Sequence, residues 1–325
     1  MRLTRQAFLR LAAGAMLIPV PPRMAAADIY PSRPIHLIVG FPPGGGVDIV
    51  ARLVAQWLSQ RFAQQVIVEN KPGAGGNIAT AIVARSAPDG YTLTYVGTVA
   101  AINPAFYKHP GFDFIRDIAP VAGLMRVPLV LEVTPVLPIK TVPELIAYAK
   151  ANPGKLNMAS SGIGTAGHVA GELFQMMTGV KLFHVPYRGE TPALNDLIAG
   201  RVQGTFNPLP ASIGFLKAGK LRGLAVTTTT RSQIFPNLPC VNDFVPGYEA
   251  SVWYGVGAPK DISMEIVERL NKEINGALVD PKIESRLAAL GGMELPGSPA
   301  DFGKLITEET AKWAKVVKFA GIQPQ

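Results

Sequence analysis

A glycine triplet with the spacing of a nucleotide-binding loop stands near the middle of this 325-residue chain. Gly162, Gly164 and Gly167 fit the G-x-G-x-x-G pattern, with an apolar strand-like run before them and an amphipathic stretch after them. Glycines at the start of a helix let the backbone approach an anionic group and aim N–H groups at it. The triplet therefore raises two interpretations, an NAD(P) enzyme and a protein that binds a smaller anion.

Two other loops supply donors of the same kind. The segment "FPPGGGVD" brings three glycines ahead of Asp48, which we expect to cap the next helix, and Thr98 follows a later strand in the same way. The candidate ligand-binding residues of the three loops are Phe41, Gly44, Gly45, Gly46, Asp48, Thr98, Ser160, Ser161, Gly162 and Thr165. None of the loops contains Lys or Arg. Neutral N–H and O–H donors at helix starts suit a carboxylate better than a bulky polyanion.

Tyr187 and Asn207 complete the candidate site. Tyr187 lies between a strand and a helix, where it could stack on a ligand or hydrogen-bond to it, and Asn207 ends a further strand. A packing role for Tyr187 and a turn role for Asn207 are the alternatives. The four histidines show no metal-ligand spacing, and HExxH, CxxC and G-x-S-x-G motifs are absent. The sequence therefore predicts no catalytic residue, no metal and no cofactor.

The N-terminal segment has the composition of an export signal. Residues 1–27 contain four arginines and no acid, an apolar run over 11–20, and small residues at Ala25 and Ala27. We expect cleavage near Ala27 and an exported mature chain. Gln6 replaces the second arginine of a twin-arginine box, which leaves the Sec and Tat routes both open. The single cysteine, Cys240, excludes an intramolecular disulfide.

The dinucleotide interpretation needs an acidic residue about 20 positions after the glycines, where it would bind the ribose. Arg188 and Glu190 are the charged residues at that place. The loop lies in the second α/β unit, and the export signal would carry the protein out of the compartment that holds nicotinamide cofactors. The formal charge of +8 is scattered, without a run of five like charges, so no nucleic-acid partner is expected. These observations favour a carboxylate receptor and keep the dinucleotide enzyme as the alternative.

Strands and helices alternate along the chain from residue 35. Short β-rich runs at 35–41, 64–70 and 91–97 each precede a helical stretch, and the same rhythm restarts after a proline-containing segment at 129–140. Thr141 is expected to cap one later helix, and Thr191 is expected to cap another. This alternation predicts two doubly wound α/β units.

The last quarter of the chain changes character. Past "SVWYGVGAPK" the alternation stops and three helical stretches follow, the last of them capped by Ser298. Because these helices bring no sheet of their own, we expect them to pack on the first unit. The prediction is an α/β chain of two lobes joined by two crossover strands. Lobe 1 comprises 28–127 plus 252–325 and lobe 2 comprises 128–251, and the ligand is expected in the cleft between them.

Long segments of the chain resemble one receptor family. "VENKPGAGGNIA" and "PYRGETPALNDL" are long enough to be specific, and they occur in order with "YPSRPIHLIVGFPPGGGVDIVARLVA", "APDGYTL", "AGKLRGLAVT" and "GVGAPKDI". The chain thereby resembles the Bug-type solute receptors of tripartite tricarboxylate transporters. The resemblance implies a two-lobed α/β periplasmic binding protein of type II. Such a protein is not an enzyme: it closes on a small carboxylated solute and delivers it to a membrane permease.

The resemblance also implies how the ligand is held. In the family, backbone N–H groups, hydroxyls and ordered waters bind a carboxylate, and the matching positions here are the loop residues named above together with Tyr187 and Asn207. Asn207 stands where many relatives have Asp, which puts an ammonium-bearing ligand in doubt. Cys240 stands in "PCVND" where "PTVxE" is usual. A monomer is expected, and the identity of the ligand and a role as a sensor input stay open.

Overall fold

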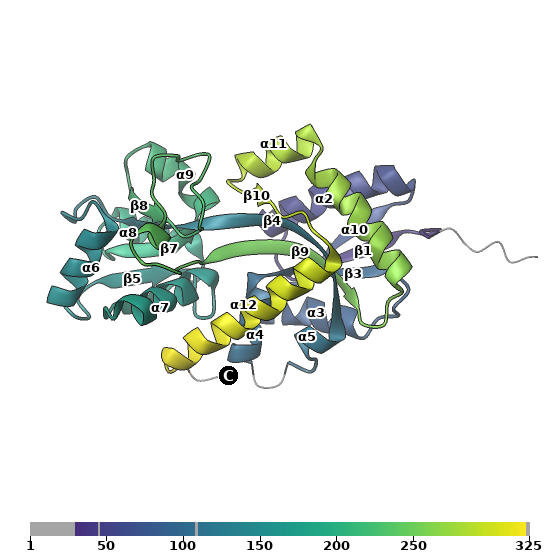
Figure 1. The fold of residues 1–325 in the computed structure, drawn as a ribbon, viewed down its shortest axis with the longest axis horizontal. Coiled ribbons are helices and arrows are strands. Elements are labelled where there is room, and N and C mark those ends of the chain that lie inside the picture. The colour runs from purple at the N-terminus through teal and green to yellow at the C-terminus, as the bar shows by residue number, and fades with distance from the viewer. Residues whose placement is uncertain (1–29, 45, 108–109, 323–325) are drawn as a thin grey trace, which may run out of the picture.

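The structure, a computed structural model, describes residues 30–44, 46–107 and 110–322. The expected export signal, its cleavage site near Ala27 and the loop residue Gly45 lie outside these ranges. Figure 1 shows two groups of strands and helices joined by two long strands, β4 (Ile118–Val133) and β9 (Ser251–Pro259). None of the helices within the described ranges is both long and apolar enough to cross a bilayer.

Lobe 1 is the group that contains the first three strands. Its elements are β1 (Ile35–Val39), α2 (Gly46–Phe62), β2 (Val66–Asn70), α3 (Asn77–Ala84), β3 (Thr92–Gly97), α4 (Thr98–Phe106), α5 (Phe114–Asp117), α10 (Met264–Leu278), α11 (Pro281–Ala289), β10 (Met293–Glu294) and α12 (Pro299–Phe319). Strand β1 pairs in parallel with β2 and with β3, whereas β9 pairs antiparallel with β3. The sheet is therefore mixed, and its antiparallel part comes from the crossover strands.

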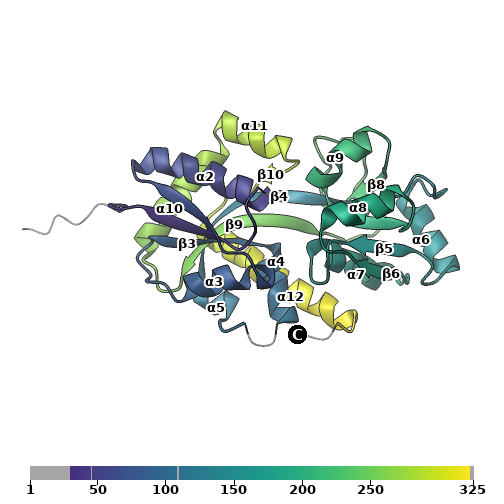
Figure 2. The ribbon, with the colours of Figure 1, turned by 180° about the vertical axis from the view of Figure 1, so that it is seen from behind.

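Lobe 2 repeats this arrangement with the middle of the chain. Its elements are α6 (Val142–Ala151), β5 (Asn157–Ser160), α7 (Ala166–Thr178), β6 (Phe183–Pro186), α8 (Glu190–Ile198), β7 (Gly204–Pro208), α9 (Leu209–Lys217) and β8 (Arg222–Val226). Strand β5 pairs in parallel with β6 and β7, and β4 pairs antiparallel with β7 and β8. Figure 2 shows the two groups from behind, with α2 and α3 in one and α8 and α9 in the other.

Hydrogen-bonded neighbours link the strands of both lobes in one continuous order, β2-β1-β3-β9-β4-β7-β5-β6. The crossover strands β9 and β4 join the two lobes in this order. Strand β4 pairs with β9 up to Pro128 and with β7 from Leu129 onward. The two-lobed α/β class predicted from the sequence is confirmed. The boundaries of 28–127 plus 252–325 and 128–251 remain a proposal, which this change of partner supports.

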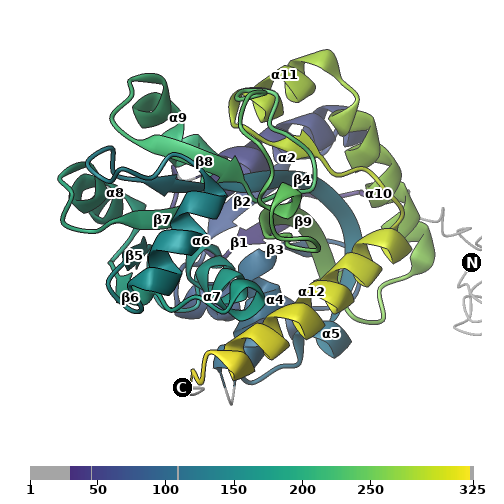
Figure 3. The same cartoon turned by 60° about the vertical axis from the view of Figure 1, so that its left-hand side comes forward.

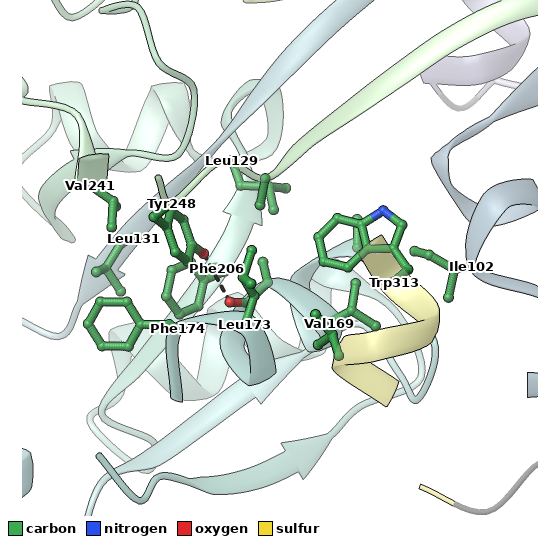
Figure 4. Close-up of a cluster of buried hydrophobic side chains, with 14 of the residues drawn as sticks. Ile102, Leu129, Leu131, Val169, Leu173, Phe174, Phe206, Val241, Tyr248 and Trp313 are labelled. Carbon is green, nitrogen blue, oxygen red and sulfur yellow. Dashed lines mark hydrogen bonds between the residues drawn. The ribbon is translucent and has the colours of Figure 1, made fainter. Parts of the chain in front are cut away.

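The last helix contacts both lobes. We expected the C-terminal helices on lobe 1, and α12 does lie against α4, but it continues to α7 of lobe 2 (Figure 3). Trp313 of α12, Ile102 of α4 and Val169 of α7 belong to a single buried cluster (Figure 4). Within the same cluster the Tyr248 hydroxyl donates to the Ala170 carbonyl at 2.9 Å. The hydrophobic core thus passes from one lobe to the other beside the crossover strands.

The helix starts test the predicted caps. Thr141 and Ser298 each accept a hydrogen bond from the third residue of their helices, as predicted. Two other caps were wrong: α2 begins at Gly46, which places Asp48 inside its first turn, and α8 begins at Glu190 after Gly189 rather than after Thr191. Gly189 has φ of 117°, so glycine makes the turn that starts α8.

Candidate functional site

A cavity of about 260 Å³ lies between the lobes. Lobe 1 lines it with Gly40, Phe41, Gly46, Val47, Gly75, Gly76, Thr80, Tyr95, Gly97, Thr98, Val99 and Ala100, and β9 adds Val252 and Tyr254. Lobe 2 lines it with Ser161, Thr165, Ala166, Gly167, Glu190 and Pro208. Five candidates from the sequence, namely Phe41, Gly46, Thr98, Ser161 and Thr165, are therefore brought together. Gly45 lies outside the described residues.

Several helices begin at this cavity. The first residues of α2 and α4 line it from lobe 1, and those of α7 and α8 line it from lobe 2. N–H groups in the first turn of a helix have no partner within the helix, and the aligned peptide dipoles make this end positive. The cavity is therefore surrounded by donors suited to an anion, contributed by both lobes.

Asp48 holds the first of these loops in place. Its side chain is buried, and its carboxylate accepts hydrogen bonds from the Gly44 N–H, Arg52 Nε and Asn70 Nδ2, each at 2.9 Å. Asn70 Nδ2 also donates to the Phe41 carbonyl at 2.9 Å. The hydrogen bond from Arg52 is the main reason why the pKa of Asp48 falls to about 2. Asp48 and Gly44 do not line the cavity, so they shape the loop that presents Phe41 and Gly46.

Thr98 combines a positioning contact with a place at the cavity. Its hydroxyl accepts from the Trp253 N–H at 2.8 Å and donates to the Ser251 carbonyl at 3.2 Å. The side chain is 1% exposed, so both contacts are made out of water. The hydroxyl is thereby engaged with the crossover strand β9, which leaves the first-turn N–H groups of α4 to face the cavity.

The lobe 2 loop is held by neutral groups. Ser160 is buried, and its Oγ lies 2.7 Å from His184 Nε2 and 3.1 Å from the Gly162 carbonyl. Thr165 Oγ1 donates to the same carbonyl at 2.7 Å. His168 Nδ1 accepts from the Gly164 N–H at 3.1 Å. Ser160 and Gly162 do not line the cavity and instead fix the loop that presents Ser161 and Thr165.

Two stacked histidines lie under this loop. The rings of His168 and His184 are 3.9 Å apart and nearly parallel, at 14°. Burial, and for His168 also the neighbouring His184, lowers the pKa of His168 to about 3, and burial lowers the pKa of His184 to about 4. Both rings are therefore neutral near pH 7. This neutral state lets a ring nitrogen of His168 accept the bond from Gly164.

Each glycine of the triplet has a structural reason for its position. Gly162 has φ of 136° and Gly164 has φ of 78°, backbone conformations that side chains disfavour. A Cβ at Gly167 would lie 2.3 Å from the Phe206 carbonyl oxygen, so a side chain there would collide with β7. The spacing that resembles a dinucleotide fingerprint thus follows from the turn and from the close packing of α7 on β7.

Tyr187 and Asn207 do not line the cavity. The Tyr187 hydroxyl donates to Asp196 at 2.8 Å, within lobe 2. Asn207 is 4% exposed, and its Nδ2 donates at 3.0 Å to Ser212, whose hydroxyl donates at 2.7 Å to Glu132. In this arrangement both side chains are hydrogen-bonded within lobe 2, beside the cavity.

Several lining residues were missed by the sequence reasoning. Gly75 and Gly76 belong to the glycine run before α3, which offered the same signal as the loops that we did choose. Tyr95 and Tyr254 lie in apolar strands, and the antiparallel pairing of β3 with β9 brings their rings to 5.5 Å from each other. For Glu190 the sequence suggests only a role as a ribose partner. The contact between Tyr95 and Tyr254 joins strands that are far apart in the chain, so spacing within the sequence gives no signal for it.

The chemistry of the cavity is that of an anion site without a fixed cation. None of its lining residues within the described ranges is Lys, Arg or His. The described residues also form no group of three or more His, Cys, Asp or Glu side chains that could hold a metal ion. Backbone N–H groups at the helix starts and the Ser161 hydroxyl remain, and hydrogen bonds to a charged group contribute about 1.5–3 kcal/mol each. The arrangement can hold one carboxylate without a cofactor.

Comparisons with known proteins match this chain to a receptor family and to related structures with bound ligands. A model of the tripartite tricarboxylate transporter family receptor matches residues 50–322. The chain is 38% identical over 299 residues to the protein BugT of Bordetella pertussis, a match that covers 91% of this chain and 92% of BugT. A solved structure from R. palustris with adipate has a TM-score of 0.79 at 40% identity and covers 91% of this chain and 100% of its own. MatC from Rhodopseudomonas palustris with bound malate has a TM-score of 0.74 at 29% identity, with coverage of 89% and 100%.

Proposed function

The chain belongs to the tripartite tricarboxylate transporter receptor family, and from this premise we propose that its cleft captures a small carboxylated solute and delivers it to a tripartite-type membrane permease. Receptors of this family are periplasmic solute-binding proteins, a class distinct from enzymes. The related structures with adipate and malate support a carboxylate as the solute. We further propose that the mature protein is a monomer without catalytic activity.

One observation carries this proposal most directly. The helix starts of α2 and α4 in lobe 1 and of α7 and α8 in lobe 2 meet at the same cavity, and no lining residue among those described is a cation. Because each lobe holds part of the donor set, closure of the lobes would complete the hydrogen bonds to the ligand. A ligand that contacts both lobes stabilises the closed arrangement, which is the form that a permease has to distinguish from the open one.

The dinucleotide enzyme is the less favoured alternative. The glycine triplet that suggested it is accounted for by the φ angles of Gly162 and Gly164 and by the contact of Gly167 with β7. The cavity of about 260 Å³ is also at the small end for a cofactor pocket. No feature of the described residues requires a nicotinamide.

A thermal-shift screen tests the proposed function. The protein beginning at Asp28, the residue after the expected cleavage site, is mixed with a panel of mono-, di- and tricarboxylates, aminocarboxylates and NADPH. A ligand at 100 times its Kd adds about 2.7 kcal/mol to the free energy of unfolding. This corresponds to a rise of a few degrees in Tm for a protein of this size. We expect a rise with one class of carboxylate and none with NADPH.

Two matched substitutions test whether the ligand binds in the cavity. Ala100→Asp puts a carboxylate beside the first turn of α4, where it competes with the ligand, so the ligand-induced rise in Tm should disappear. Ala289→Asp adds the same charge at an exposed position of α11 and should leave the rise unchanged. A shift with NADPH alone, or equal shifts in both variants, would overturn the assignment of the cleft.

A further inference from the structure

Glu190 is the acidic residue of the cavity. It is the first residue of α8, follows Gly189, and lines the cavity from lobe 2, while Tyr254 lines the same cavity from β9. The negative charge of Glu190 is felt by the Tyr254 hydroxyl, where burial is the main cause of a raised pKa and Glu190 adds to it. Glu190 therefore points its charge toward the space between the lobes.

The carboxylate of Glu190 has no hydrogen-bond or ion-pair partner among the residues that the structure describes. The remaining described lining residues are neutral, and Arg188, two positions earlier, is exposed and does not line the cavity. Partial burial raises the pKa of Glu190 above its ordinary value. A carboxylate withdrawn from water without a partner is destabilising, and an opposite charge or a donor on a ligand would relieve this.

We propose that Glu190 sets the ligand class of the cleft, by pairing with the ammonium group of an aminocarboxylate whose own carboxylate lies at the starts of α2, α4 and α7. This inference rests on the proposed function, because it needs the carboxylate end of the ligand to be bound first. Tyr95 and Tyr254 lie in the same cavity, and aromatic faces attract cations as well. The cleft thus offers donors for one end of the ligand and an acceptor for the other.

A dicarboxylate fits this cavity less well. Its second carboxylate would meet the charge of Glu190, and like charges at close range oppose binding. Asn207 had given a reason to doubt an ammonium-bearing ligand, because relatives often carry Asp there. That reason falls away, since Asn207 does not line the cavity and is bonded to Ser212. The acid comes instead from the start of α8, at Glu190.

The experiment compares matched pairs of ligands by calorimetric titration near pH 7.5. The pairs are succinate with β-alanine, glutarate with γ-aminobutyrate, and adipate with δ-aminovalerate, each pair sharing one spacer between its two charged ends. For the pairs that bind, we expect the aminocarboxylate to bind at least about tenfold more tightly than its dicarboxylate. Glu190→Gln keeps the size of the side chain and should remove this preference, by weakening the first ligand and strengthening the second.

The control is Glu268→Gln, which removes the same charge from an exposed position of α10 away from the cavity lining. It should leave the preference unchanged. A wild-type protein that prefers dicarboxylates, or a preference that survives in Glu190→Gln, would overturn the role of Glu190 while leaving a carboxylate receptor in place. If no ligand with a carboxylate binds the wild-type protein in the broader screen, the proposed function itself fails and this inference fails with it.

Discussion

The two lobes present similar helix starts to the cavity but hold them by different means. In lobe 1 the loop before α2 is held by a charged network, in which Asp48 accepts bonds from Gly44, Arg52 and Asn70. In lobe 2 the loop before α7 is held by neutral histidines and hydroxyls. A helix start can therefore be held at the cavity by an ion pair or by neutral hydrogen bonds, and the two solutions respond differently to pH and to substitution.

The largest expected effect is on stability, and it contrasts a crowded glycine of lobe 2 with an uncrowded glycine of lobe 1. Gly167→Ala would place a Cβ 2.3 Å from the Phe206 carbonyl oxygen, whereas a Cβ at Gly46 meets no atom within 4 Å. We expect the first substitution to lower the free energy of unfolding by about 3 kcal/mol or more. Gly46→Ala should change it by less than about 0.5 kcal/mol. Thermal or urea unfolding checks this, and equal losses in the two variants would contradict the packing of α7 on β7.

The second effect is pH dependence, which should come from lobe 2. The pKa values of about 3 for His168 and about 4 for His184 lie below the ordinary 6.5, so between these values the folded protein binds fewer protons than the unfolded chain. Their contribution to stability is complete above pH 6.5 and is lost as the pH falls toward 4. The loss by pH 5 should be on the order of 2 kcal/mol for each of the two histidines. Asp48 in lobe 1 loses its contribution only as the pH falls from 3.8 toward about 2.

The measurement is Tm against pH for the wild-type protein and for His184→Gln, whose side chain does not titrate and can still reach Ser160. Burial raises the pKa of Glu132 to about 8, so this group gains stability as the pH falls and opposes the histidines in both proteins. Relative to the wild type, the variant should therefore lose less stability between pH 6.5 and 4. Identical profiles in the two proteins would show that the acid response comes from other groups, and the contrast between the lobes would then fail.

The third effect tests the charged network of lobe 1. Asp48→Asn keeps the shape of the side chain but removes the charge that faces Arg52 and the Gly44 N–H, so it should cost about 1–2 kcal/mol of stability. It should also weaken ligand binding severalfold, because the loop that carries Phe41 and Gly46 loses its anchor. Unfolding and calorimetric titration check both outcomes. A loss of stability with unchanged affinity would show that the loop does not take part in binding.

The smallest effect concerns Tyr187, which the sequence placed in the site and the structure places beside it. Tyr187→Phe removes the hydrogen bond to Asp196 at 2.8 Å, so the loss of stability should be about 0.5–1 kcal/mol. The Kd for the ligand should change by less than about twofold, since Tyr187 does not line the cavity. A much larger change in Kd would return Tyr187 to the list of ligand-binding residues.

Local signals in the sequence predicted the parts of the fold that neighbouring residues determine. The strand and helix alternation and the caps Thr141 and Ser298 are of this kind. Asp48 and Thr191 carried the same cap signal, but glycines at or just before the observed helix starts moved each start to an earlier residue. Cap preference is a weak signal when a glycine nearby can turn the chain.

The sequence predicted which loops form the candidate site better than it predicted which of their side chains line the cavity. Ser161 and Thr165 face the cavity while Ser160, their neighbour, turns to His184. This choice depends on the pairing of β5 with β6, which brings His184 beside the loop. Tyr254 reaches the cavity by the pairing of β9 with β3. Both are long-range contacts, which periodicity within one segment does not describe.

The position of β9 has a consequence for the order in which the molecule is made. This strand lies between β3 and β4 in the sheet of lobe 1, yet it comes after the whole of lobe 2 in the chain. During synthesis, the ribosome therefore releases all of lobe 2 while lobe 1 still lacks a central strand and the helices that follow it. Long-range pairings form late and leave strand edges unpaired until they do. A growing chain of this protein stays unfinished at its N-terminal lobe until β9 and the helices that follow it have been made.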